Sequence, residues 1–425
     1  MLEQPGHGLL DQEFSSLQAA PEPASRAGLR PAPAPPGWPT SARGCMVPAR
    51  SPQEGPLKIT RVEATTHNVP VPVPLLDAPV MRSFVLCTVE TDDGATGYGI
   101  TGPIQRHAVR ELISRELAPL VLGADPFETE RIGHRLAVEL NPRAQTGAFS
   151  SAMSALDIAL WDIKGKATGQ PVWRLAGGAQ SRVPAYITFG LPEYTVEQLV
   201  QVAKDFVAAG EDKLKMVVGV AGDHQGWQED ARRVQAVREA IGEGVQLSVD
   251  ANYMLQFNNA LKLCKAIEPF DIAWFEEPLW GNDAPLLHDL RMRTSIPLSG
   301  GQNEGSLARH RELLVHGAVD ILQPNVVYCG GFTEGLKIAG MAQAFNVPIA
   351  NGGGWPQHNM HLQAAVPHGW RVEYHYVMWK AIEMTFEGTA GPERGWVTMP
   401  ERPGLGLEPR WDALGEWRDK QGQSP

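Results

Sequence analysis

The 425-residue sequence has few cysteines, and their spacing excludes two kinds of architecture. The four cysteines, Cys45, Cys87, Cys264 and Cys329, are far apart and form no Cys-x-x-Cys pair. This pattern disfavours a disulfide framework and a structural zinc site, and it is typical of a reduced, cytosolic chain. We therefore expect a cytoplasmic protein.

Long hydrophobic runs and excess positive charge are also lacking. No apolar run reaches the length of a transmembrane segment, and no apolar region follows a basic start, so we expect neither a membrane span nor a signal peptide. The formal net charge of −11 argues against binding to nucleic acid or to an anionic membrane surface. The length of the chain allows two domains and a large core.

The chain divides into four regions of different pattern. Residues 1–55 are rich in proline and alanine and bury too little apolar surface to offset the entropy of ordering, so we predict a disordered tail; a start at Met46 is a second hypothesis. Residues 57–180 show alternating strand patterns and then helical ones, which predicts an α+β domain. Residues 181–385 form a repeated pattern, and residues 386–425 are expected to return to the first domain.

The repeated pattern predicts a closed α/β barrel. Eight short apolar segments begin near residues 183, 213, 246, 272, 297, 320, 347 and 371, and helical patterns fill most gaps. This recurrence is typical of a (β/α) barrel of the TIM type. A doubly wound open sheet is the alternative, but the eight units and the lack of a Gly-x-Gly-x-x-Gly turn favour closure.

Two predicted strands end abruptly in acidic residues. Asp250 follows the apolar residues 246–249, and Glu276 follows residues 272–275, with one helix-length segment between them. A right-handed βαβ unit opens both carboxyl ends onto one face, so Asp250 and Glu276 are expected to lie close together. Neighbouring carboxylates repel, and a divalent cation is the usual compensation. The alternative is that both acids are merely solvated.

Several longer motifs support one family resemblance. They are SALDIALWDIKGKATGQPVWRLAGG at 154–178, VDAN at 249–252, WFEEP at 274–278, DILQPN at 320–325 and PGLG at 403–406. With them, the chain resembles the mandelate racemase / muconate-lactonizing group of the enolase superfamily. The resemblance implies a modified TIM barrel, (β/α)7β, under an N-terminal α+β capping domain. It also implies a bound Mg²⁺, with Mn²⁺ as an alternative ion, a small-molecule carboxylate substrate and a homo-oligomer.

The resemblance implies three metal ligands. The first two match Asp250 and Glu276, whereas the third, normally a glutamate, falls on Gln302. An amide oxygen can ligate Mg²⁺ but brings less charge, so we expect weaker binding; the alternative is that Gln302 is only a polar residue at the barrel mouth. Three neighbouring residues are expected to support the ligands: Asn252, Asn303 and Glu277.

The residues implied in proton transfer depart further from the family pattern. Lys215 matches the first lysine of the family's Lys-x-Lys motif, and Lys213 lies two residues earlier on the same strand face. The family's histidine position falls within residues 351–354, which contain none, although His358 lies just beyond. The remaining candidates follow from the same comparison: Asn325 and Glu373 for catalysis, and Trp355 for substrate shape.

Three functions are compatible with these residues. The leading hypothesis is a Mg²⁺-dependent lyase that dehydrates a sugar acid, in which Lys215 or His358 removes the α-proton and the metal offsets the charge of the enediolate. A racemase or epimerase of a 2-hydroxy or amino acid would need a base on the second face of the substrate, where none is evident. A non-catalytic ligand-binding relative that lost its proton-abstraction residues is the third.

Overall fold

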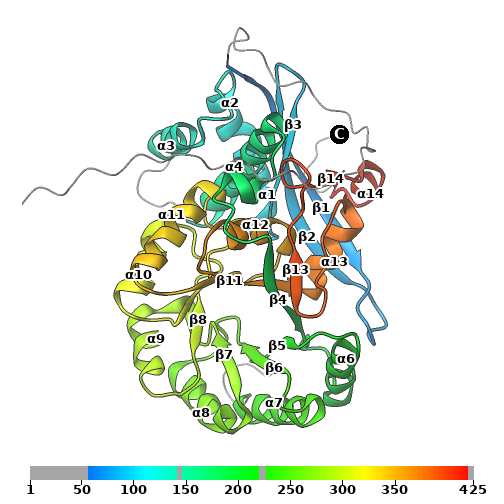
Figure 1. Cartoon of the computed structure of the whole chain (residues 1–425), viewed down its shortest axis with the longest axis vertical. Helices are drawn as coiled ribbons and strands as arrows, with labels where there is room; N and C mark the ends of the chain where they lie inside the picture. Colours follow the sequence, from blue (N-terminus) through cyan, green and yellow to red (C-terminus); the bar gives the residue numbers. More distant parts are fainter. Residues whose placement is uncertain (1–55, 141–145, 220–225, 420–425) are drawn as a thin grey trace, which may run out of the picture. The chain divides into compact units, whose positions relative to one another are not determined.

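The structure is a computed structural model that describes residues 56–140, 146–219 and 226–419 (Figure 1). The predicted disordered tail at 1–55, Met46 and Cys45 lie outside the described residues. None of the described helices is both long and apolar enough to cross a membrane.

The first part of the described chain is an antiparallel sheet covered by helices. Strands β1 (Ile59–Val71), β2 (Val80–Thr91) and β3 (Thr96–Thr101) pair in the order β1-β2-β3. The helices that follow are α1 (Arg106–Glu111), η1 (Leu112–Leu117), α2 (Ala118–Val121), α3 (Thr129–Leu140), α4 (Ala148–Thr168) and α5 (Val172–Leu175).

Helix α4 lies unusually close to β3 because two glycines leave room for it. A Cβ atom at Gly97 would stand 2.1 Å from the carbonyl oxygen of Ala159, and one at Gly99 would stand 2.0 Å from that of Ala155. The long apolar helix that the sequence pattern predicts can therefore bury its face directly against the sheet backbone.

The second part is a closed parallel barrel. Its strands are β4 (Arg182–Phe189), β5 (Lys213–Val217), β6 (Gln246–Asp250), β7 (Ile272–Glu276), β8 (Leu298–Gly300), β9 (Ile321–Leu322), β10 (Ile349–Ala350) and β11 (Gly369–His375). Each pairs in parallel with the next, and β11 pairs with β4 to close the ring. The predicted fold class, a modified TIM barrel with an N-terminal α+β domain, is confirmed.

Helices connect the barrel strands and surround them. They are α6 (Val196–Ala208), α7 (Trp227–Ile241), α8 (Phe257–Ile267), η2 (Glu268–Phe270), η3 (Trp280–Asn282), α9 (Ala284–Arg291), α10 (Leu307–Val315), α11 (Gly331–Ala344), α12 (Pro356–Ala365) and α13 (Tyr376–Thr385). The chain ends with β12 (Phe386–Glu387), β13 (Trp396–Thr398), β14 (Glu408–Pro409) and α14 (Trp411–Glu416).

The two parts and the last segment are joined by buried polar contacts. Asp157 on α4 accepts hydrogen bonds from the backbone N–H, at 3.0 Å, and the hydroxyl of Thr333 on α11. The last segment returns to the first sheet, where Asn68 N donates to Trp417 O at 2.9 Å. The carboxyl ends of the barrel strands are thereby held under the N-terminal sheet.

The tight packing of α4 on β3 gives a stability prediction. Gly99→Ala should lower the free energy of unfolding by about 1–3 kcal/mol, because the added methyl group forces the helix away from the strand. Gly340→Ala is the matched control: a Cβ there meets nothing within 4 Å, so stability should be unchanged or slightly raised. Thermal unfolding of both variants checks the prediction, and equal melting temperatures would contradict it.

Candidate active site and metal centre

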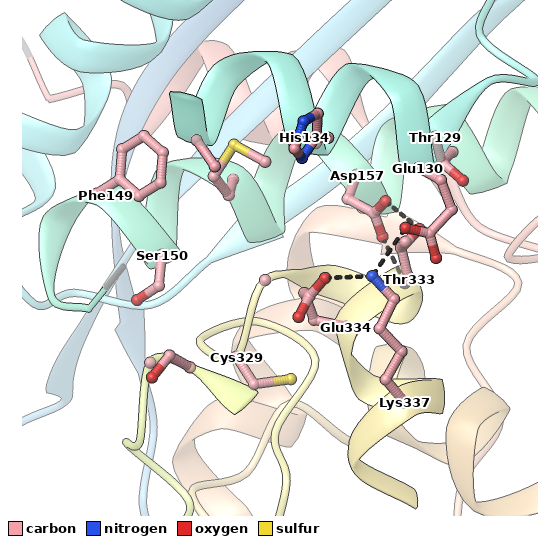
Figure 2. A pocket seen from close by; sticks show the side chains of 16 residues that line it. Thr129, Glu130, His134, Phe149, Ser150, Asp157, Cys329, Thr333, Glu334 and Lys337 are labelled. Atoms are coloured by element: carbon pink, nitrogen blue, oxygen red, sulfur yellow. Dashed lines mark hydrogen bonds and ion pairs between the residues drawn. The ribbon is translucent and has the colours of Figure 1, made fainter. Parts of the chain in front are cut away.

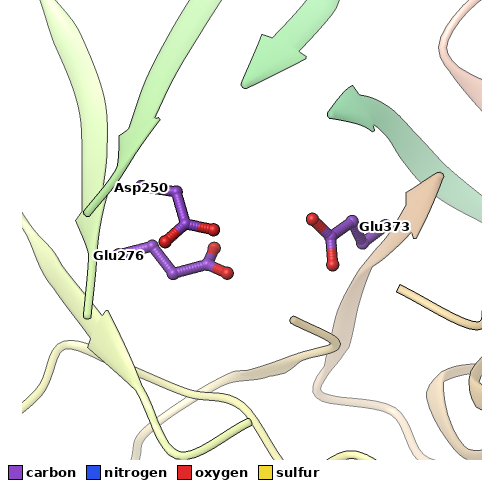
Figure 3. Close-up of side chains that lie close together, drawn as sticks. All are labelled: Asp250, Glu276 and Glu373. Carbon is purple, nitrogen blue, oxygen red and sulfur yellow. The ribbon is translucent and has the colours of Figure 1, made fainter. Parts of the chain in front are cut away.

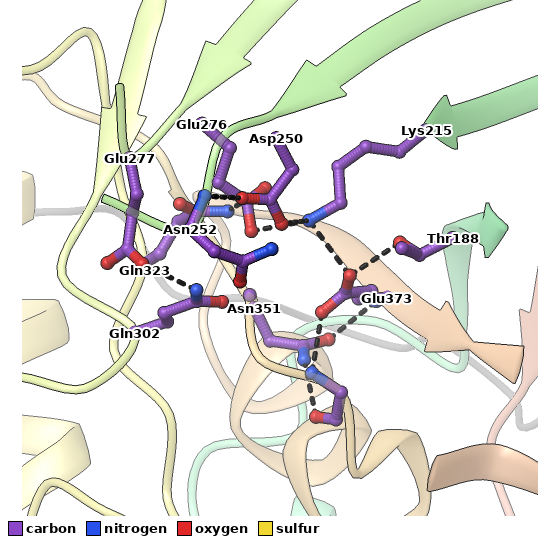
Figure 4. Close-up of polar contacts among 12 residues, drawn as sticks. Thr188, Lys215, Asp250, Asn252, Glu276, Glu277, Gln302, Gln323, Asn351 and Glu373 are labelled. Carbon is purple, nitrogen blue, oxygen red and sulfur yellow. Dashed lines mark hydrogen bonds and ion pairs between the residues drawn. The ribbon is translucent and has the colours of Figure 1, made fainter. Parts of the chain in front are cut away.

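A lysine ammonium lies among three carboxylates at the carboxyl ends of the barrel strands. Lys215 on β5 is completely buried. Its Nζ is 2.9 Å from Asp250 Oδ2 and 2.8 Å from Glu373 Oε1, and it also contacts Glu276 Oε1 (Figure 4). Asp250 and Glu276 are direct partners in the pairing of β6 with β7, whereas Glu373 comes from β11.

The three carboxylates face one another across the barrel mouth (Figure 3). Asp250, Glu276 and Glu373 are all buried, and each offers an oxygen within 4.8 Å of the others. Burial and the neighbouring carboxylates raise the pKa of Glu276 well above its usual range, although Lys215 opposes the shift. The single ammonium does not fully compensate three crowded carboxylates, and a divalent cation placed among them would favour their charged forms.

Burial and charge act in opposite directions on Lys215. Removal from water alone would lower the pKa of its ammonium, but Asp250, Glu276 and Glu373 outweigh this effect and raise the pKa well above the ordinary value. The Tyr186 ring, 5.5 Å from Nζ, covers another side of the ammonium. Lys215 therefore holds its proton and is paired as an ammonium with these carboxylates.

Glu373 is held by groups from three segments. Its carboxylate accepts a hydrogen bond from the hydroxyl of Thr188 on β4 and one of 2.6 Å from Gly354 N after β10. Its own backbone N–H donates to Asn351 Oδ1 at 2.6 Å. With Lys215 as a further partner, this carboxylate has little capacity left for another ligand.

Glu276 and Asp250 are oriented by neighbouring donors. Gln323, directly after β9, donates from Nε2 to Glu276 Oε2 at 2.9 Å, and Trp274 Nε1 donates to the same oxygen at 3.3 Å. Asn252 contributes its backbone N–H to Asp250 Oδ1 at 2.9 Å. These contacts leave Glu276 Oε1 and Asp250 Oδ2 facing the site.

Gln302 has an oxygen that suits a third metal ligand. Its Nε2 donates to Glu277 Oε2, and its Oε1 is buried without a hydrogen-bond partner. A Cβ placed on Gly352 would stand 2.8 Å from both Gln302 Oε1 and Glu276 Oε1, so the two oxygens face the same small space. Because Glu373 is already satisfied and Gln302 Oε1 is not, Asp250, Glu276 and Gln302 fit a divalent cation best.

Glu277 fixes the amide of Gln302. It also accepts a hydrogen bond of 2.9 Å from Asn282 Nδ2, and burial raises its pKa to about 7. The predicted supporting residue Asn303 is instead exposed, with its amide against the hydroxyl of Tyr253.

Four of the predicted site residues do not join the lysine–carboxylate group. Lys213, at the start of β5, pairs with Asp212 at 2.6 Å. Asn325 donates to Gly352 O at 2.7 Å and accepts from Asn359, so it holds the turn after β10. The other two, His358 and Trp355, lie in the buried interior.

His358 and Trp355 are placed by the start of α12. Burial lowers the pKa of His358 to about 3, and none of its contacts in the described part of the chain reaches the carboxylates. Trp355 has a left-handed backbone (φ 58°) that turns its ring into the core against Phe84, with ring centroids 6.2 Å apart. Its Nε1 donates to the Tyr328 hydroxyl at 3.3 Å.

Some residues at the site were not identified from the sequence. Thr188, Gln323 and Asn351 all lie at carboxyl ends of barrel strands, so their position at a strand end was the available signal. His375 was also missed, although it ends β11 two residues after Glu373 and therefore shares its strand face.

A separate pocket lies between the first domain and the barrel (Figure 2). It is bounded by α3, α4 and α11, and its residues include Asp157 and Lys337, which bridges Glu130 and Glu334 at 2.7 Å each. None of the lysine–carboxylate residues lines it, so it is distinct from the candidate active site.

A closed barrel, an α+β domain above its mouth and carboxylates at successive strand ends define an enolase-like barrel protein. Residues 58–177 match the family model for the mandelate racemase / muconate lactonizing enzyme N-terminal domain, and residues 198–413 match the enolase C-terminal domain-like model. The chain belongs to the mandelate racemase / muconate-lactonizing group of the enolase superfamily.

Named relatives cover most of the chain. It is 32% identical over 365 residues to the 3,6-anhydro-α-L-galactonate cycloisomerase of Streptomyces coelicolor, which covers 84% of this chain and 98% of the relative. It is 30% identical to the arabinonate dehydratase of Saccharolobus solfataricus, over 79% of this chain and 91% of the relative. The structure of L-talarate dehydratase from Polaromonas sp. JS666, complexed with Mg and L-glucarate, superimposes with a TM-score of 0.77 at 29% identity, covering 86% and 98% of the two chains.

The free oxygen of Gln302 gives a metal-binding prediction. Gln302→Glu should tighten Mg²⁺ binding by about tenfold or more, because a charged ligand replaces a neutral one, and Gln302→Leu should weaken it by a similar factor. Calorimetric titration of the purified protein with Mg²⁺ measures both. Asn303→Ala, at the exposed neighbour, is the control and should leave the affinity unchanged. If Gln302→Leu binds as the wild type does, Glu373 becomes the better third ligand.

Proposed function

We propose that the protein is a Mg²⁺-dependent hydro-lyase that removes water from a sugar acid. The observation that carries this proposal is Lys215, buried between Asp250, Glu276 and Glu373 at the strand ends of an enolase-type barrel. The names of the relatives support it, because dehydratases and cycloisomerases of sugar acids both act on hydroxylated carboxylates.

Asp250, Glu276 and Gln302 would hold the metal ion. When bound, the ion supplies positive charge that offsets the second negative charge formed on the substrate carboxylate after loss of the α-proton. The buried surroundings of these ligands strengthen that effect, because charges interact more strongly away from water.

Lys215 is the candidate base for the α-proton. Its ammonium is kept protonated by the three carboxylates, and its pKa falls once the charges of Asp250 and Glu276 are engaged by a cation. The neutral amine then takes the proton from the carbon next to the substrate carboxylate. Glu373 holds the lysine side chain in position through its contact with Nζ.

The same lysine can complete the elimination. The electron pair left on the α-carbon forms a double bond to the β-carbon, and the β-hydroxyl leaves as water with the proton carried by the Lys215 ammonium. The enol that remains rearranges to a 2-keto-3-deoxy acid. A single residue suffices for both proton transfers when the α-hydrogen and the β-hydroxyl lie on the same side.

Cycloisomerisation is a second candidate, favoured by the identity to the Streptomyces cycloisomerase. Its first step is the same α-proton removal by Lys215. It differs in that a ring oxygen, not a free hydroxyl, leaves the β-carbon, so no water is lost and the product has the mass of the substrate.

Three finer expectations belong to this proposal. Mn²⁺ should replace Mg²⁺, because both ions prefer oxygen ligands in octahedral geometry. We also propose that the protein is a homo-oligomer and that it works in the cytoplasm. Size-exclusion chromatography with light scattering tests the first of these two assignments, and cell fractionation tests the second.

The lysine pair on β5 gives a direct test of the mechanism. With a panel of sugar acids and Mg²⁺, Lys215→Met should lower kcat by about 10²–10⁴-fold, because the proton acceptor is lost. Lys213→Met is the matched control on the same strand and should keep wild-type turnover. Mass spectrometry measures the loss of water from the substrate.

Other experimental outcomes would favour one of the alternative functions. Turnover that survives Lys215→Met rules out the proposed base. Deuterium uptake from solvent at the α-carbon of recovered substrate, without dehydration, would favour a racemase or epimerase. No turnover of any sugar acid, together with no Mg²⁺ binding by calorimetry, would favour the non-catalytic ligand-binding relative.

A further inference from the structure

Arg82 is a cation near the barrel mouth that has no anionic partner among the described residues. It lies on β2, opposite Val69, and is partly buried. Its Nε is buried without a hydrogen-bond partner, and no residue in the described ranges forms an ion pair with it. A guanidinium whose Nε is shielded from water without a partner is costly, so a position of this kind is typical of a site that an anion completes.

The packing of β2 directs Arg82 toward the barrel. Residues 82 and 84 share one face of the strand, and Phe84 on that face packs against Trp355 at the start of α12. The loop before β2 is tied to the barrel, since Tyr194 donates from its hydroxyl to Pro74 O at 2.7 Å and Gln198 donates to Leu75 O at 2.9 Å. Strand β2 is therefore fixed over the strand ends.

The neighbours of Arg82 place it on one side of the mouth. Tyr328, in the segment after β9, and His375, at the end of β11, both lie within range of its charge. Strand β2 and helix α13 are in contact, and α13 begins directly after His375. Lys215, Asp250 and Glu276 lie on β5, β6 and β7, so Arg82 faces the reacting groups from the β9–β11 side.

His375 connects the two cationic positions. Burial lowers its pKa to about 3, and the charges of both Arg82 and Lys215 contribute in the same direction. Its Nδ1 is buried without a hydrogen-bond partner. A ligand that extends from Lys215 toward Arg82 would therefore pass a second unsatisfied polar group.

We propose that Arg82 binds a terminal carboxylate, so that the substrate is a sugar di-acid whose other carboxylate lies at Lys215. This inference rests on the proposed function. A guanidinium pairs with a carboxylate through two parallel hydrogen bonds, which satisfy the donors and the charge together. A mono-acid ends in a neutral hydroxyl at the same place and would leave the buried charge of Arg82 uncompensated.

The test compares two acids that differ only at the far end. Galactarate carries a carboxylate where galactonate carries a hydroxymethyl group. With Mg²⁺, the wild type should have a kcat/KM for galactarate about 10²-fold higher than for galactonate. Arg82→Met should reduce the galactarate value by a similar factor and leave galactonate within threefold, because only the di-acid uses the guanidinium. Arg82→Lys should recover part of the loss.

A matched control removes an arginine of the same sheet without touching the mouth. Arg61 on β1 is exposed and paired with Glu63 and Glu90, so Arg61→Met should keep the wild-type preference. Equal kcat/KM values for the two acids in the wild type, or equal losses for both in Arg82→Met, overturn the inference. Faster turnover of 6-phosphogluconate than of gluconate, without a preference for galactarate, would instead assign Arg82 to a phosphate and also overturn it.

Binding separates failure of this inference from failure of the proposed function. If no sugar acid is turned over but calorimetry with Mg²⁺ detects galactarate binding that Arg82→Met abolishes and Arg61→Met retains, the assignment of Arg82 stands and the lyase assignment fails. If turnover occurs without any dependence on Arg82, the lyase assignment stands and that of Arg82 fails. If no sugar acid is turned over and galactarate is not bound, both fail.

Discussion

A buried ammonium surrounded by three buried carboxylates is the interaction on which the barrel mouth depends. Lys215, Asp250, Glu276 and Glu373 come from β5, β6, β7 and β11, so one set of contacts ties together strands on both sides of the ring. Removing one partner of a buried ion pair costs about 3–5 kcal/mol, because the other charge stays in the protein without compensation. Under the proposed mechanism, a cation that replaces the ammonium would compensate the same carboxylates, so metal binding would be coupled to the release of the Lys215 amine.

The main parts of the fold and two members of the site could be predicted from the sequence. The regular spacing of apolar segments gave the closed barrel, and the abrupt change from apolar to acidic residues gave Asp250 and Glu276, which the structure pairs directly across β6 and β7. Both predictions depend on properties of neighbouring residues in the chain. Strand period and strand polarity then fix where a side chain points, and little else is required.

The positions of the other candidate residues depend on turns and on long-range packing, which local sequence patterns do not specify. Lys213 shares a strand face with Lys215, but it is the first residue of the five-residue strand β5 and pairs with Asp212. A single left-handed residue, Trp355, starts α12 and turns its own ring into the core. That no residue in the described part of the chain pairs with Arg82 is likewise visible only in the structure, since an arginine in a strand pattern is otherwise ordinary.

The charge balance of the site explains why an amide can stand at position 302. When all three carboxylates are charged, they and the one ammonium leave two negative charges in the described site, which is the charge that one divalent cation neutralises. A fourth carboxylate at this position would face Glu277, whose burial already raises its pKa to about 7, and would add repulsion before any ion is bound. Gln302 instead donates to Glu277 and keeps an oxygen for the metal. If Gln302 is the third ligand, as we propose, its amide lowers the metal affinity but avoids repulsion within the site, and the oxygens of a carboxylate-bearing substrate would add to the ligand set.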